Sequence, residues 1–368
     1  MKKYLLELKK LGYHFSQEEL EKPFDELGLE SFDLLNIRTS LEKKLGLPIV
    51  DSTWLQFKSV FDVVLFCDFH DSQEKYFPKT KKTQLFSKQI SIEMPQMALG
   101  AMSENWFLKE IGSIHWQMLC EGLKTKSSEL KDEENQRLYA TFVRIKVEYG
   151  LPLNQFKENE NLKFKAKIKR FGESLYYSEI KSKAGNTEIK AKMMSSFSVR
   201  NANDNSQLLK SKPFSKINKI EELFENDKFG EDYLAIKKQI KHFLKLDKYK
   251  FLLNRKVVFE ANYRLNPYYD MNGVGLLYFA AYPIISDFCE AQYFNQSFEN
   301  EVRWEENYST LSRDIFYYGN CNINDEIIYK LHEFSFDDDG KVMLLSALHR
   351  KSDEKKIAQI FTIKSNQK

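Results

Sequence analysis

The sequence predicts a mixed α+β protein in which a small amino-terminal helical bundle precedes two similar units, each a long antiparallel sheet around one helix. Residues 266–288 repeat the pattern of residues 94–116 without gaps, which places Phe279 on Phe107. Each copy is a proline-containing loop that runs into an apolar helical stretch, and segments of alternating polarity follow both. The chain therefore contains one helix-and-sheet plan made twice.

Length and charge narrow the class of protein. The chain has 368 residues, of which 42% are hydrophobic and 14% aromatic, enough to fill the cores of two or three domains. Lys and Arg total 56 against 53 Asp and Glu, and this near balance argues against a nucleic-acid binder, in which basic residues are concentrated on one face. We expect small ligands or protein partners.

Cysteine usage and the apolar segments predict a cytoplasmic protein. The four cysteines form no CxxC pair, so neither a disulfide framework nor a metal site is expected. Glu7 interrupts the apolar run at the amino terminus, and the apolar stretch 273–285 is too short to cross a bilayer. We expect neither export nor membrane insertion.

Residues 1–70 show three apolar series at helical spacing and predict a three- or four-helix bundle. The series are Tyr4, Leu5, Leu8 and Leu11; Leu34, Ile37, Leu41 and Leu45; and Phe57, Val60, Val63, Val64 and Phe66. Ser31 stands where the second of these helices should begin, in L-G-L-E-S-F-D-L-L, where a serine often caps a helix. The polar, lysine-rich residues 71–86 follow and predict a linker.

Residues 87–201 and 251–368 form the two helix-and-sheet units, and residues 202–250 join them. In the first unit Ser103 is the expected N-cap of an apolar helix that ends near Glu121. Alternating segments follow near 137–148, 162–170, 174–182 and 188–199, and in the second unit near 310–318, 326–336, 341–350 and 356–363. In the joining region, 221–224 and 233–244 are expected to be helical. A curled sheet around one buried helix is the hot-dog architecture, so the predicted fold class is α+β with a double hot dog.

Chemistry is expected where the helices begin. Free backbone N–H groups and the positive end of the helix dipole at such a position can stabilise the oxyanion or enolate of a thioester reaction. The candidate site residues are Glu104 and Asn105 in one copy and Asp270 and Asn272 in the other, for which helix-cap and turn roles are the alternative. Neither loop contains a histidine, which counts against a dehydratase, and His115 is expected to be a core residue.

Residues 2–69 resemble acyl or peptidyl carrier proteins. The spacing from Leu27-Gly28 through Ser31 to Leu41-Glu42 is that of the family, although Glu30 and Phe32 replace the usual D and L of D-S-L. The resemblance implies 4′-phosphopantetheine carried covalently on Ser31, attached by a phosphopantetheinyl transferase. A thiol on a flexible arm raises the effective concentration of its acyl cargo at a tethered site.

Residues 85–368 resemble a double hot-dog biosynthetic family that includes the bifunctional acyltransferase/decarboxylase of the leinamycin polyketide pathway. The segments that carry the resemblance are M-P-Q-M-A-L-G-A-M-S-E-N-W, R-L-Y-A, N-P-Y-Y-D-M-N-G-V-G-L-L-Y-F-A and S-R-D-I-F-Y-Y-G-N. The resemblance implies an enzyme that acylates its own tyrosine from methylmalonyl-CoA, decarboxylates the acyl group and passes it to a carrier thiol. Tyr139 is the candidate nucleophile; Tyr268, Tyr269, Tyr317 and Tyr318 are alternatives.

The sequence thus predicts an enzyme that processes acyl thioesters in polyketide or hybrid natural-product biosynthesis, with acyl-CoA as substrate and the carrier proteins of a biosynthetic megasynthase as partners. Acyl transfer, with decarboxylation of a methylmalonyl-type group, is the leading expectation. A hot-dog thioesterase or dehydratase is the enzymatic alternative. A non-catalytic module that binds acyl carriers is the third.

Overall fold

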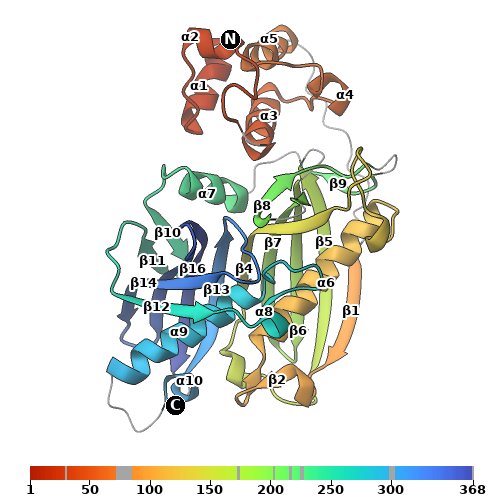
Figure 1. Cartoon of the computed structure of the whole chain (residues 1–368). Helices are drawn as coiled ribbons and strands as arrows, with labels where there is room; N and C mark the ends of the chain where they lie inside the picture. Colours follow the sequence, from red (N-terminus) through yellow and green to blue (C-terminus); the bar gives the residue numbers. More distant parts are fainter. Residues whose placement is uncertain are drawn as a thin grey trace. The chain divides into compact units, whose positions relative to one another are not determined.

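A computed structural model describes residues 1–29, 31–71, 85–171, 175–201, 204–214, 218–223, 228–297 and 303–366, without the side chains of residues 31 and 32. The described chain forms two compact units (Figure 1). Unit 1 comprises residues 1–83, 169–176 and 221–242, and unit 2 comprises residues 84–168, 177–220 and 243–368. Most of the predicted linker, residues 72–84, is outside the described residues.

Unit 1 is mainly helical, and helices form where the apolar spacing predicts them. Its elements are α1 (Lys2–Lys10), α2 (Gln17–Glu21), α3 (Ser31–Leu45), α4 (Asp51–Trp54), α5 (Val60–His70), β9 (Glu221–Glu222) and α7 (Lys228–Lys237). Capping boxes at Ser16 and Ser59 fix the starts of α2 and α5. Tyr4, Ile37, Leu41 and Val63 are fully buried in the shared core of α1, α3 and α5.

The joining region departs from its prediction. Residues 221 and 222 form the short strand β9, parallel to the end of β5, instead of a helix. The helix α7 ends at Lys237, and Leu244 lies in a strand. Local apolar spacing over such short segments does not separate helix from strand, so pairing with a sheet edge decides the outcome.

Unit 2 is built on one large antiparallel sheet with the order β1-β5-β6-β7-β4-β13-β16-β15-β14-β12. The first half of this path consists of β1 (Phe86–Ser91), β4 (Tyr139–Glu148), β5 (Asn161–Phe171), β6 (Leu175–Ala184) and β7 (Thr187–Asn201), with β8 (Asp204–Lys210) beside β7. The second half consists of β12 (Phe259–Arg264), β13 (Tyr308–Tyr317), β14 (Glu326–Phe336), β15 (Val342–Arg350) and β16 (Lys356–Asn366). The long strands form close to the predicted alternating segments.

The path has the same internal arrangement at both ends. Along the chain, the strands of the first half are β1, β4, β5, β6 and β7, and those of the second half are β12, β13, β14, β15 and β16. When the two series are matched one to one, each strand and its counterpart lie equally far from the β4–β13 joint in the sheet order. The halves join through β4 and β13, where Ile145 pairs with Ile315. The repeat seen in the sequence is therefore a repeat of strand order.

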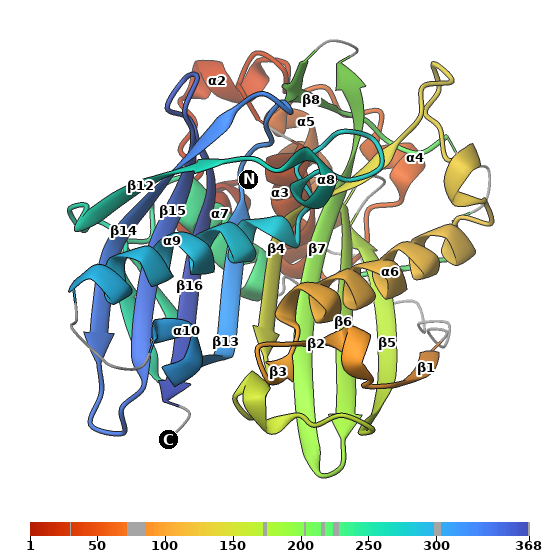
Figure 2. The same ribbon diagram turned by 60° about the horizontal axis from the view of Figure 1, so that its bottom comes forward.

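Two long helices, α6 (Glu104–Gly122) and α9 (Ala281–Ser297), lie against the same face of this sheet, one over each half (Figure 2). Ser103 caps α6 and the helix ends one residue beyond Glu121, as predicted. Phe107 of α6 stacks on Phe164 of β5 at 6.1 Å between ring centroids. The apolar sides of the helices and the inward side chains of the strands form the core.

The ungapped repeat does not give the correct start of α9. It places Glu104, the first residue of α6, on Leu276, whereas α9 begins at Ala281. The short helix α8 (Pro267–Asp270) and a tight turn intervene. The second copy thus has a longer entry into its helix, which apolar content alone does not reveal.

Shorter elements complete unit 2: β2 (Met97–Ala98) and β3 (Ala101–Met102) before α6, α10 (Trp304–Asn307) before β13, and the hairpin β10 (Phe243–Leu246) and β11 (Tyr249–Leu252). Phe251 of the hairpin packs on Phe361 of β16 at 5.5 Å between centroids. All four cysteines are free. Among the helices that the structure describes, none has the length and apolarity to cross a bilayer.

Candidate functional site

The amino-terminal turns of α6 and α9 meet side by side in unit 2. The Asn105 side-chain amide donates a hydrogen bond of 3.0 Å to the carbonyl of Ala280, directly before α9. Phe279 lies over Gly112 of α6, where a Cβ atom would be 2.4 Å from the ring. Only a glycine permits this approach, so the segment directly before α9 packs closely on α6.

The amino end of α6 has unsatisfied donors. The Ser103 hydroxyl accepts the amide of Trp106 at 3.3 Å, which satisfies one of the first-turn N–H groups. The backbone amides of Glu104 and Asn105 donate no hydrogen bond to any other described residue. The sequence therefore places two free donors and the positive end of a 19-residue helix at this point.

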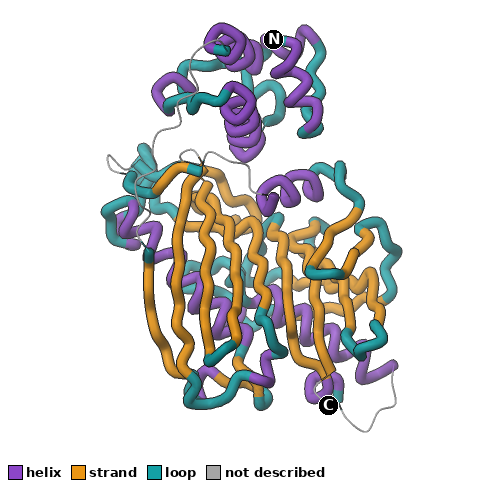
Figure 3. The backbone as a smooth tube through the Cα atoms, turned by 180° about the vertical axis from the view of Figure 1, so that it is seen from behind, coloured by secondary structure: helices purple, strands orange, loops and turns teal. Residues whose placement is uncertain are grey.

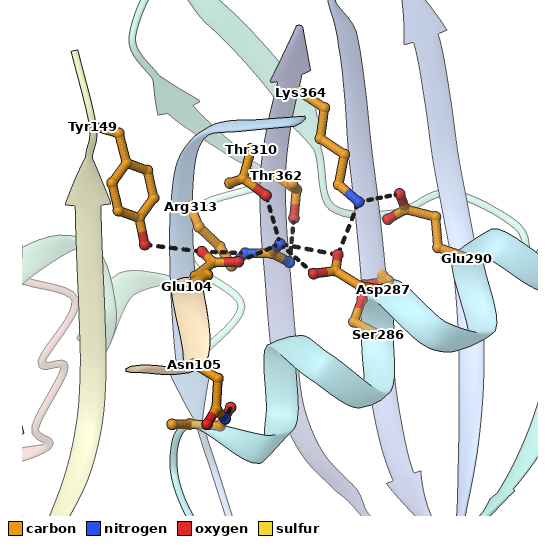
Figure 4. A network of polar contacts seen from close by, with 12 residues as sticks. Glu104, Asn105, Tyr149, Ser286, Asp287, Glu290, Thr310, Arg313, Thr362 and Lys364 are labelled. Carbon is orange, nitrogen blue, oxygen red and sulfur yellow. Dashed lines mark hydrogen bonds and ion pairs between the residues drawn. The ribbon is translucent and has the colours of Figure 1, made fainter. Parts of the chain in front are cut away.

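Arg313 of β13 organises the polar groups around this helix start (Figure 4). Its guanidinium donates to both oxygens of Glu104, at 2.9 and 2.8 Å, and to both oxygens of Asp287 of α9, at 2.9 Å each. It also donates to the hydroxyls of Thr362 at 3.1 Å and Thr310 at 3.2 Å. Arg313 is 1% exposed, so one buried cation joins an acid from each helix.

Lys364 of β16 extends the network. Its ammonium lies 2.9 Å from Asp287 and 2.6 Å from Glu290, and the indole of Trp304 donates to Glu290 at 2.7 Å. At the other end, the hydroxyl of Tyr149 donates to Glu104 at 3.1 Å. Three acids and two bases thus share one buried cluster, which we call the acid cluster: Glu104, Asp287, Glu290, Arg313 and Lys364.

The members of the acid cluster differ in protonation and in access to water. Burial raises the pKa of Glu104 and of Glu290, although Arg313 and Lys364 oppose it. Burial acts in the same direction on Asp287, but Arg313 and Lys364 together outweigh it and lower the pKa of that carboxyl. The side chain of Asp287 is 29% exposed, against 5% for Glu104. Asp287 is therefore the ionised acid that solvent or a ligand can reach.

The predicted site residues separate into two groups. Glu104 and Asn105 belong to the helix junction, where Glu104 binds Arg313 and Asn105 binds the carbonyl of Ala280. Asp270 is fully buried at the end of α8, where it accepts the amide of Asn266 at 2.7 Å and the hydroxyl of Tyr263 at 3.1 Å. Asn272 accepts the amides of Val274 and Leu276, both at 3.0 Å. These two residues shape the turn before α9 instead of its first turn.

Tyr139 lies away from the acid cluster. It is half-buried at the first position of β4, pairs with Ser198 and has the guanidinium of Arg137 5.4 Å from its ring centroid. The end of β4 that reaches Glu104 is the opposite one, at Tyr149, roughly 30 Å away at about 3.3 Å per residue. The structure brings Tyr149 to the helix start and does not bring Tyr139 there.

His115 is a core residue, as predicted. It is fully buried, and its Nδ1 and Nε2 atoms each lie 2.7 Å from a hydroxyl, those of Ser178 and Ser195. Burial lowers its pKa to about 3, so the imidazole is neutral. For Ser31 the backbone begins α3, while its side chain is outside the described residues.

Sequence reasoning missed most of the acid cluster, although one signal was present. Arg313 and Asp314 interrupt the apolar strand T-L-S-R-D-I-F, and consecutive strand residues face opposite sides of a sheet. Arg313 accordingly faces the helices, and Asp314 accepts from Arg144 at 2.9 and 2.6 Å. Nothing local indicates that Asp287 and Lys364 converge on the same arginine.

The described residues contain no group of three or more His, Cys, Asp or Glu side chains arranged to hold a metal ion. The acid cluster instead has its own internal cations. Its chemistry is that of carboxylates and backbone amides.

Comparison with known proteins shows the fold. No family model matches the chain, and no curated protein matches its sequence. Among solved structures, the 12:0-ACP thioesterase from Umbellularia californica matches with 9% identity and a TM-score of 0.52, over 77% of this chain and 94% of that one. An acyl-ACP thioesterase from Bacteroides thetaiotaomicron matches with 10% identity and a TM-score of 0.48, over 76% of this chain and 98% of that one. The chain thus has the mixed α+β fold of hot-dog thioesterases, with a large antiparallel sheet and helices.

Proposed function

We propose that this protein is an enzyme that processes acyl thioesters of CoA or of carrier-bound pantetheine, with hydrolysis favoured over acyl transfer. The observation that supports it most is the position of Asp287, a partly exposed and ionised carboxylate that Arg313 links to the side chain of Glu104, the first residue of α6. The 12:0-ACP thioesterase from Umbellularia californica has a similar fold, which also favours hydrolysis.

The proposed reaction uses the helix start and Asp287 on one thioester carbonyl. The amides of Glu104 and Asn105 face the carbonyl oxygen, where negative charge develops. Asp287 accepts a proton from a water molecule while the water oxygen bonds to the carbonyl carbon. The carbon–sulfur bond then breaks, and the leaving thiolate takes up the proton that Asp287 accepted, which restores the carboxylate. Arg313 and Lys364 hold Asp287 in position throughout.

A single site per chain follows from the unequal halves. At the start of α9 the corresponding surroundings are apolar: Phe279 lies over Gly112, and Phe142 lies 4.5 Å from Phe279 between centroids. On β4, the residue that pairs with Arg313 across the joint is Val147, which carries no charge. We therefore assign catalysis to the start of α6 alone.

Acyl transfer is the second candidate, and the surroundings of Tyr139 favour it. Tyr139 is half-buried and has the guanidinium of Arg137 5.4 Å from its ring centroid, so its hydroxyl is a candidate nucleophile for an acyl group. In that case the chain acts as the leinamycin-type acyltransferase/decarboxylase does, moving the acyl group from CoA to tyrosine and then to a carrier thiol. A module that only binds acyl carriers would show neither hydrolysis nor transfer.

The finer architecture is part of the proposal. The mirrored strand order supports two hot dogs in one chain, at residues 87–201 and 251–368. Residues 1–70 are proposed as a carrier domain bearing phosphopantetheine on Ser31, the first residue of α3. A phosphopantetheinyl transferase and carrier proteins of a megasynthase are then its partners, and a cytoplasmic location remains a prediction.

Thiol release from a panel of acyl-CoAs, with the protein followed by intact mass spectrometry, tests this proposal. Asp287→Asn should lower kcat/KM by about 10²–10⁴-fold. Asp314→Asn is the matched control, because it also removes a buried carboxylate paired with an arginine, on the other face of the sheet. Equal turnover by Asp287→Asn and wild type excludes the proposed base.

Mass spectrometry separates the alternatives. An acyl adduct on the wild type that is absent from Tyr139→Phe establishes acyl transfer instead of hydrolysis. A phosphopantetheine adduct that persists in Ser31→Ala, after treatment with a transferase, excludes Ser31 as the carrier serine.

A further inference from the structure

Lysines gather on the outer face of the first half of the sheet, opposite the face that α6 covers. In β5 the side chains alternate between exposed and buried along Asn161–Phe171, so that every second residue points outward. Ion pairs place neighbouring strands on the same face: Glu179 of β6 lies 2.5 Å from Lys167 of β5 and 4.0 Å from Lys192 of β7. The lysine face is made of Lys146, Lys163, Lys165, Lys167, Lys181, Lys183, Lys190 and Lys192.

This face holds the positive excess of the whole chain. Its eight lysines share it with three acids, Glu148, Glu179 and Glu188, a local excess of five positive charges. The chain as a whole has a net charge of +3. The remaining residues are therefore slightly acidic, and the basic character is localised. The nearly equal numbers of basic and acidic residues in the whole chain therefore do not reveal this face, which has the charge of a surface that binds an anionic partner.

Folding alone does not account for this distribution. Lys146 of β4 lies directly opposite Lys192 of β7, and like charges in that position destabilise a sheet. The corresponding face of the second half is covered differently, by the hairpin β10–β11 through Phe251 and Phe361. In Figure 3, which views the sheet from behind, the strands of unit 2 lie in front of its long helices. The lysine face is thus a specific property of the first half.

The side chains favour an acidic protein over nucleic acid. The glutamates stand between lysines, where they would repel a continuous phosphate backbone but match a protein surface of separated carboxylates. Arg144, on the same side of the sheet, is buried and paired with Asp314, and the aromatic side chain of the face, Tyr177, is 4% exposed with its hydroxyl bonded to Glu179. Surfaces that bind single strands instead present open aromatic rings for stacking.

We propose that the lysine face is a docking surface for a separate, acidic helical protein of the carrier class. The choice of the carrier class rests on the proposed function, whereas the existence of the docking surface rests on the charges alone. Because α6 and the acid cluster lie on the other face of the sheet, a partner docked here leaves the candidate active site uncovered.

Binding of an apo-acyl carrier protein to the full chain tests the proposal, because the apo form has no pantetheine arm to enter the candidate active site. The face variant is Lys163→Glu/Lys165→Glu/Lys181→Glu. The control variant, Lys124→Glu/Lys126→Glu/Lys157→Glu, makes the same charge change at exposed lysines elsewhere in unit 2. The face variant should raise Kd at least about tenfold at low salt, and the control less than about twofold. The difference should shrink at about 0.5 M salt, where charges are screened.

Two results with the apo-acyl carrier protein overturn the proposal: no binding by the wild type, or an equal loss of affinity in the face variant and the control variant. A third is that the wild type binds duplex DNA more tightly than the apo carrier protein and that the face variant weakens DNA binding to the same extent. Lys163→Gln/Lys165→Gln/Lys181→Gln, which should give an intermediate Kd, shows that charge and not misfolding is responsible. Hydrolysis of acyl-CoA needs no docked protein, so the face variant should retain it. Loss of hydrolysis from every form, with docking intact, would refute the proposed function and leave the docking surface standing.

Discussion

Replacing Arg313 by methionine should be among the most destabilising single changes in unit 2. The substitution keeps an unbranched side chain of similar length but removes the cation that contacts Glu104 and Asp287. Lys364 still neutralises part of the charge of Asp287, whereas Glu104 keeps only the hydroxyl of Tyr149. Breaking a buried pair in this way costs about 3–5 kcal/mol of the free energy of unfolding.

The pH dependence of the variant gives a sharper test. Without Arg313 the pKa of Glu104 should rise further, because burial is then opposed less. A carboxyl whose folded pKa lies above its unfolded value destabilises the protein more as pH rises between those two values. The variant should therefore recover stability as pH falls from 7 toward 5, and Glu104→Gln should rescue it at pH 7.

Urea unfolding followed by tryptophan fluorescence measures these changes, since Trp106, Trp116 and Trp304 all lie in unit 2. Arg303→Met is the matched control: its side chain is 71% exposed and its ion pair with Glu305 spans 3.7 Å, so the loss should stay below about 1 kcal/mol. A loss below about 1 kcal/mol in Arg313→Met, or strict additivity with Glu104→Gln, would refute the proposed role of Arg313.

Three further changes test the packing and electrostatics of the helices. His115→Gln should reduce the loss of stability at low pH. The folded pKa of His115, about 3, lies below the unfolded value of about 6.5, so the free energy of unfolding of the wild type falls by up to about 1.4 kcal/mol per pH unit as pH falls between those values. In urea titrations over this pH range the variant should lose less stability than the wild type. Gly112→Ala should cost about 1–3 kcal/mol through its clash with Phe279, and Phe279→Leu should relieve the clash; equal stability of Gly112→Ala and wild type would contradict the packing. Asn105→Leu should cost about 0.5–1.5 kcal/mol by removing the hydrogen bond to the carbonyl of Ala280, and a neutral effect in thermal unfolding would contradict a stabilising role for this contact.

The sequence predicted secondary structure best where a long segment has one clear period. Alternating residues located the long strands within a few positions, and Ser103 marked the start of α6. Prediction failed at residues 221 and 222, which form a strand, at residues 238–244, which follow the end of α7, and at the start of α9, where a turn built by Asn272 precedes the helix. In short segments, pairing and turn geometry outweigh local preference.

The candidate site was predictable only in part. Glu104 and Asn105 follow from the rule that a helix start offers free amides, and this rule needs only the local sequence. Asp270 and Asn272 satisfied the same local rule and proved to build a turn. Tyr139 was chosen for its place at the head of a strand, but the opposite end of that strand reaches the helix start.

By itself, the amino-acid sequence determined the elements of this protein: a helical amino-terminal segment and two copies of a helix with long antiparallel strands. It determined these because apolar periodicity and capping act between residues that are close in the chain. Only the tertiary structure decided that Glu104, Asp287 and Arg313 share one buried site, and that lysines from four strands form one face. Such groupings depend on the pairing of strands and the crossing of helices far apart in sequence, and no local pattern records them.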